Sequence, residues 1–67
     1  MTSDLDIYRS ASAILKRYGE GAIAHAAMRA DELLAAGDIE GQAIWKQILR
    51  AVKMLQARER PEGAREH

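Results

Sequence analysis

The stretch from Gly37 to Trp45 constrains the fold of this chain more than any other feature. Gly37 is suited to end a helix in the left-handed conformation, and Asp38 is suited to accept hydrogen bonds from the first turn of the next helix. Trp45 follows where that next helix begins its apolar stripe, so we expect the Trp45 side chain to enter the core. The stretch therefore predicts two helices joined by a tight turn and packed along each other.

Apolar residues recur at spacings of three and four along three segments, which predicts helices over about 4–18, 21–36 and 39–58. Ser3 can cap the first helix, and Gly19 can close it. The inward stripe of the second helix consists largely of alanine, so a neighbouring helix can approach it closely. Gly41, in the first turn of the third helix, costs up to about 1 kcal/mol against alanine. It indicates either a close contact, with the first helix or a partner, or fraying.

These segments define an all-α fold class, a compact three-helix bundle over residues 1–56. The link over 19–21 is so short that the first two helices must form an antiparallel hairpin or cross steeply. After the bundle, residues 57–67 are highly charged and carry no large apolar side chain, so we expect a disordered C-terminal tail. Pro61 disfavours helix at the residue before it, which limits the third helix.

Composition excludes several classes of protein. The chain has 67 residues, no cysteine and thirteen alanines, so its stability must come from a small helical core, from association, or from both. Ten basic and ten acidic residues cancel, which argues against a dedicated nucleic-acid binder and against a polybasic membrane anchor. No apolar run approaches the ~18 residues of a membrane-spanning helix. With a polar start unlike a signal peptide, we expect a cytoplasmic protein.

No motif supports catalysis or a cofactor. Gly19-Glu20-Gly21-Ala22-Ile23-Ala24 matches the G-x-G-x-x-A dinucleotide fingerprint in letters, but it follows a predicted helix where that motif requires a strand. His25 is the only histidine within the predicted bundle, and no set of metal ligands surrounds it, so we expect a surface histidine. We expect no catalytic residue, no metal, no cofactor and no small-molecule substrate, and thus no enzyme.

The residues most suited to an interaction lie on the third predicted helix. Lys46, Arg50 and Lys53 form a basic line at spacings of four and three. This line predicts either a contact with phosphate or an acidic partner, or a solvated helix face whose aliphatic stems cover the edge of the core. Trp45 adds a possible contact residue, because tryptophan is frequent at the energetic centres of interfaces.

Tyr18-Gly19, Gly37-Asp38, Gly41 and Ile44-Trp45-Lys46 followed by Ile48 form a recurring pattern of helix punctuation. In this pattern the chain resembles families of short, uncharacterised bacterial helical proteins over about residues 5–56. The resemblance implies a stand-alone α-helical domain of unknown function, and it carries over no catalytic residue.

We therefore expect a small non-enzymatic module that binds an unknown protein partner or associates with itself, with a homodimer as one form. The motivation is the thin core of a short chain beside broad apolar stripes on its first and third helices. The alternative is a regulatory protein that contacts nucleic acid through Lys46, Arg50 and Lys53, although the zero net charge makes nucleic acid the weaker expectation.

Overall fold

The computed structural model describes residues 3–59, and all regular structure within them is helical, with no strand. The elements in order are α1 (Asp4–Tyr18), the short 3-10 turn η1 (Gly19–Gly21), α2 (Ala22–Ala35) and α3 (Ile39–Glu59). The all-α class predicted from the sequence is thus confirmed for this range. The third helix, predicted over about 39–58, ends at Glu59, so it extends into the range 57–67 that the sequence analysis also assigned to the tail. The remainder of the predicted tail, residues 60–67, lies outside the described residues.

Capping chemistry sets both ends of α1. The Ser3 hydroxyl oxygen accepts a hydrogen bond from the backbone N–H of Asp6 at 3.2 Å, as a helix cap requires. At the other end Gly19 has a φ of 57°, and its N–H bonds to the carbonyl of Leu15. The chain then makes a single 3-10 turn and enters α2 directly. The dinucleotide-like letters therefore lie between two helices, where no strand positions them for a phosphate.

The turn between α2 and α3 has the geometry that its sequence predicts. The N–H of Asp38 donates to the carbonyl of Leu33 at 2.9 Å, and the N–H of Gly37 donates to the carbonyl of Leu34 at 3.0 Å. This pair of bonds is the Schellman motif, and it places Gly37 at a φ of 83° that side-chain-bearing residues rarely adopt. Asp38 then begins α3 by accepting a hydrogen bond from the N–H of Gly41 at 2.9 Å. One residue thus completes α2 and caps α3.

Gly41 has a local explanation. A Cβ atom built on Gly41 would lie 2.6 Å from Oδ2 of Asp38, so the close neighbour is the capping carboxylate itself. The contact lies within the turn and does not involve α1, which corrects the first of the two expectations for this residue. The carboxylate ends a side chain and could rotate away only with loss of its capping bond to the Gly41 N–H, so glycine is favoured here without being strictly required.

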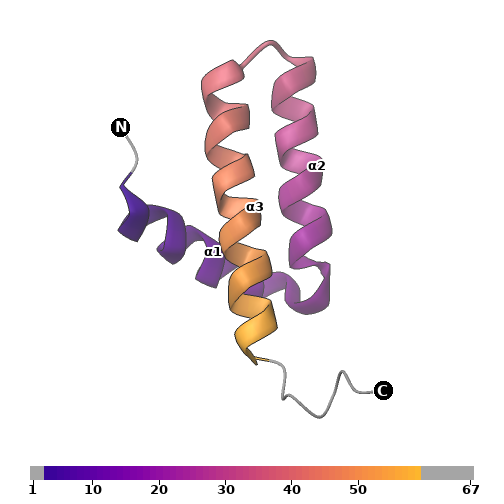
Figure 1. Ribbon diagram of the computed structural model, residues 1–67. Coiled ribbons are helices and arrows are strands. Elements are labelled where there is room, and N and C mark those ends of the chain that lie inside the picture. The colour runs from indigo at the N-terminus through magenta and orange to yellow at the C-terminus, as the bar shows by residue number, and fades with distance from the viewer. Residues whose placement is uncertain (1–2, 60–67) are drawn as a thin grey trace.

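The three α-helices are not packed side by side along their lengths. Figure 1 shows α2 and α3 as an antiparallel hairpin, while α1 crosses the hairpin steeply near the end that is remote from the α2–α3 turn. Of the two hairpin helices, α3 takes most of the contact with α1. The short link favours this crossing over a second hairpin. The unit is compact but elongated, with principal extents of 42 × 23 × 18 Å.

The buried core is small and built largely from alanine. Its members are Ile7, Ala11, Leu15, Ala22, Ala26, Ala30, Ile48, Ala51 and Val52. Five of the nine are alanines, as the inward stripe of α2 led us to expect, so the helices approach closely and enclose little volume. Trp45 is only partly buried and packs against this core from the edge, whereas the sequence predicted it inside. No helix within residues 3–59 combines the length and apolar character that a bilayer crossing requires.

Candidate functional site

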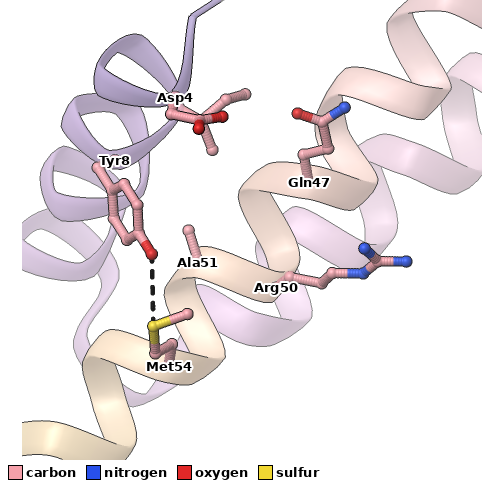
Figure 2. A pocket seen from close by; sticks show the side chains of 7 residues that line it. Asp4, Tyr8, Gln47, Arg50, Ala51 and Met54 are labelled. Carbon is pink, nitrogen blue, oxygen red and sulfur yellow. Dashed lines mark hydrogen bonds between the residues drawn. The ribbon is translucent and has the colours of Figure 1, made fainter.

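A groove runs between α1 and α3 on the side of α3 that α2 does not cover (Figure 2). We call it the α1–α3 groove, and it has a volume of about 320 Å³ and is open to solvent. Its lining residues are Asp4, Ile7 and Tyr8 from α1, and Gln47, Arg50, Ala51 and Met54 from α3. The groove exists because α1 crosses α3 at an angle, so the two helices diverge toward the start of α1.

Large apolar side chains remain exposed along this groove. Tyr8 is 39% exposed and Met54 is 45% exposed, and the Tyr8 hydroxyl lies 3.4 Å from the Met54 sulfur. Figure 2 shows this contact bridging the two helices across the groove. Leu5, one turn before Tyr8 on α1, is 61% exposed. The isolated chain thus leaves a tyrosine and a methionine partly in water around one hollow, with an exposed leucine nearby that does not line it, and exposed apolar side chains of this kind are a feature of interaction surfaces.

The groove carries one charge of each sign. Asp4 extends from α1, and Arg50 extends from α3 away from Asp4 (Figure 2). The single ion pair found among the described side chains, those of residues 3–58, joins Arg29 to Glu32 at 2.8 Å, so neither Asp4 nor Arg50 has an ionic partner among them. Both charges are exposed, so water solvates them in the isolated chain. They are available to a partner without first breaking an internal ion pair.

The basic line predicted from the sequence continues this surface along α3. Lys46, Arg50 and Lys53 are all exposed. A second, shallower hollow of about 250 Å³ is lined by Gln42, Ala43, Lys46, Gln47 and Arg50. It shares Gln47 and Arg50 with the α1–α3 groove, so the two hollows form one continuous surface. Of the predicted interaction residues, Arg50 lies in both hollows and Lys46 in one.

Trp45, the fourth predicted interaction residue, belongs to a different environment. Its ring meets the ring of His25 edge-on at 5.9 Å, and His25 stacks on Tyr18 at 4.1 Å between ring centroids. The guanidinium of Arg29 lies 5.7 Å from the centre of the Trp45 ring, within the range of a cation–π interaction. We call this the Tyr18–His25–Trp45 stack. It joins the end of α1 to α2 and α3, so Trp45 is turned toward α2.

The stack corrects the expectation that His25 is a surface histidine. His25 is half-buried because Tyr18 and Trp45 cover its two sides. Arg29 forms the ion pair with Glu32 that their three-residue spacing predicted. The stack is thus explained by packing between the three helices. Among the described residues, no three histidine or acidic side chains gather as ligands of a metal ion.

The sequence pointed to the α3 side of the groove but missed its α1 side. Leu5, Ile7 and Tyr8 lie in one apolar stripe, and the pattern alone does not tell which of them a neighbour covers. The available signal was the width of that stripe, which is broader than one crossing helix can bury. Met54 had no signal of its own, because a single methionine beside a core stripe is ordinary in a helix.

Comparison with known proteins identifies no relative. No protein-family model, no curated protein and no solved structure matches this chain.

Proposed function

We propose that this chain is a small non-enzymatic protein-interaction module that uses the α1–α3 groove as its contact surface. One observation carries the proposal: Tyr8 and Met54 remain partly exposed on the two walls of a single hollow, in a chain whose buried core is mostly alanine. Covering these side chains would stabilise the complex by ~25 cal/mol for each Å² of apolar surface removed from water. A chain with so small a core depends on such additional stabilisation. The apolar side chains that the isolated chain leaves exposed would then be buried in the complex.

The groove supports protein binding better than catalysis or small-molecule binding. It is wide and open, whereas sites for small ligands enclose most of the ligand surface. Its polar groups are a carboxylate and the Tyr8 hydroxyl on the α1 wall and an amide and a guanidinium on the α3 wall. The Tyr8 hydroxyl donates a hydrogen bond to the Met54 sulfur, so no nucleophile is paired with a base. The absence of cysteine supports a cytoplasmic setting for the module.

A pair of matched methionine variants tests the proposal. Met54, in the groove, and Met28, on the outer side of α2, are 45% and 54% exposed. We expect Met54→Gln to weaken any association of the chain, with itself or with a protein captured from its source cell. Met28→Gln should leave that association unchanged. Sedimentation velocity and capture with each variant measure both. A wild-type chain that stays at 7.4 kDa and captures nothing specific contradicts the proposal.

The second candidate is a nucleic-acid contact through Lys46, Arg50 and Lys53, and one observation favours it. All three cations are exposed on α3, and none takes part in an ion pair among the described residues. Against it stand the zero net charge and the position of Trp45, which is turned toward α2 and not available on this face for base stacking.

Salt-dependent binding decides on this candidate. If the three cations contact phosphates, log K should fall against log salt with a slope of about −0.9 per contact on duplex DNA. Lys46→Glu with Arg50→Glu should then abolish binding, while Arg9→Glu with Lys16→Glu, an equal charge change on α1, should weaken it far less. Equal loss in the two double variants would show a non-specific charge effect and eliminate this candidate.

A further inference from the structure

We propose that the occupant of the α1–α3 groove is a second copy of this chain. The two copies would be related by a two-fold axis that runs along the groove. This inference rests on the proposed function and names the partner that the surface fits. An axis in this direction turns one copy over and exchanges the two walls of the groove. As a result, α1 of each copy lies over α3 of the other.

The charges on the two walls make the surface complementary to itself. The α1 wall carries the carboxylate of Asp4, and the α3 wall carries the guanidinium of Arg50, with Lys46 farther along α3. Neither Asp4 nor Arg50 has an ion-pair partner within the described part of its own chain. Exchange of the walls brings each acid toward the base of the other copy. Two equivalent Asp4–Arg50 pairs then form, one on each side of the axis.

The apolar residues of the groove follow the same exchange. Tyr8 lies on the α1 wall and Met54 on the α3 wall, and both are partly exposed. In the two-fold pairing, Tyr8 of each copy faces the Met54 side of the other. Methionine adapts its shape and packs well against aromatic rings, so this pairing needs little rearrangement.

Other protein ligands fit the charges less well. An acidic helix would neutralise Arg50 but would bring like charge to Asp4, and a basic helix would have the reverse defect. A complementary ligand must carry both signs in the right order across an apolar centre. The surface of this chain has that order. The exposed pairs should contribute mainly to orientation and partner choice, while the apolar contacts provide affinity.

Charge reversal tests the pairing directly. In Asp4→Lys, each Arg50 would meet a lysine across the interface, and in Arg50→Asp each Asp4 would meet an aspartate. We expect either variant to weaken the dimer by about tenfold or more. Asp6→Lys makes the same charge change in the same first turn of α1, but Asp6 does not line the groove, so this control should dimerise like the wild type.

Mixing the two reversed variants gives the decisive result. A mixed dimer of Asp4→Lys with Arg50→Asp contains one lysine–aspartate pair and one native pair, so mixing should restore association. The double variant, with both changes in one chain, should also associate with itself. Sedimentation velocity measures all species, and circular dichroism verifies that each variant is helical. An effect exerted within one chain could not be restored by mixing.

Three results would overturn the inference. The first is a wild-type dimer that neither reversal weakens. The second is a dimer weakened by both reversals that neither the mixture nor the double variant restores. The third is a wild-type monomer that captures a different protein through the groove. In the third case the groove still binds protein, so the proposed function stands. In the first two cases the Met54→Gln and Met28→Gln pair decides separately whether the groove is the contact surface. A monomer that captures nothing overturns both.

Discussion

The two ends of the α2–α3 hairpin differ in what holds them together. At the end crossed by α1, Ile48, Ala51 and Val52 are buried against residues of α1 and α2. At the turn end, no residue from 31 to 47 is buried, although Leu33, Leu34, Ile39 and Ile44 are all apolar. The turn end depends instead on the Schellman bonds, the Asp38 cap and the Arg29–Trp45 contact. The comparison shows that the buried side chains larger than alanine gather where α1 crosses the hairpin, while α2 adds only buried alanines.

The largest expected effect contrasts two isoleucines of α3. Ile48 is 4% exposed at the crossed end, and Ile39 is 61% exposed at the turn. We expect Ile48→Ala to lower the free energy of unfolding by about 2–5 kcal/mol, which would unfold much of so small a domain. Ile39→Ala should change it by less than about 0.5 kcal/mol. Urea unfolding followed by circular dichroism measures both. Equal losses would show that the turn end has a core of its own.

Close helix contact at the crossed end predicts an intermediate effect. Ala26 is completely buried between the helices, and Ala24, two positions earlier on α2, is exposed. Ala26→Leu should force the helices apart and reduce the free energy of unfolding by about 1–3 kcal/mol. Ala24→Leu, which adds the same side chain toward solvent, should be nearly neutral. Thermal unfolding compares the two variants, and an unchanged midpoint for Ala26→Leu would indicate a looser interior.

The smallest expected effect concerns the backbone at the two links. Gly37 has a φ of 83°, whereas Gly21 has a φ of −84° and open space where a Cβ atom would lie. Gly37→Ala should destabilise the chain by about 1 kcal/mol, because alanine is strained at positive φ. Gly21→Ala should stabilise it by about 0.4–1 kcal/mol by restricting the unfolded chain. Opposite shifts of the urea midpoint confirm the contrast, and shifts of the same sign contradict it.

What could be predicted from the sequence was local. Ser3, Gly19, Gly37 and Asp38 act within a few residues of their own positions, so the positions of the helix ends followed from capping chemistry alone. The Arg29–Glu32 pair followed from helical spacing in the same way. The alanine-rich stripe of α2 likewise predicted that a neighbouring helix approaches it closely.

What could not be predicted depends on how the helices cross. A stripe shows which face of a helix is apolar, but it does not show which part of that face a neighbour reaches. Ile7 and Tyr8 are adjacent in one stripe, yet one is buried and the other is exposed at the groove. The partial burial of His25 was not predicted for the same reason, because Tyr18 and Trp45 reach it from other helices.

The different sequence separations of the helix contacts have a consequence for the order in which the chain folds. The Schellman turn joins α2 and α3 through residues that are near neighbours in sequence, so this hairpin can form by closing short loops. The contact between Tyr8 and Met54 spans 46 positions, so α1 closes a much longer loop to reach α3. Closing the longer loop has the greater entropic cost. We therefore expect the hairpin to form early and α1 to dock late, so that the core and the α1–α3 groove arise in the same final step.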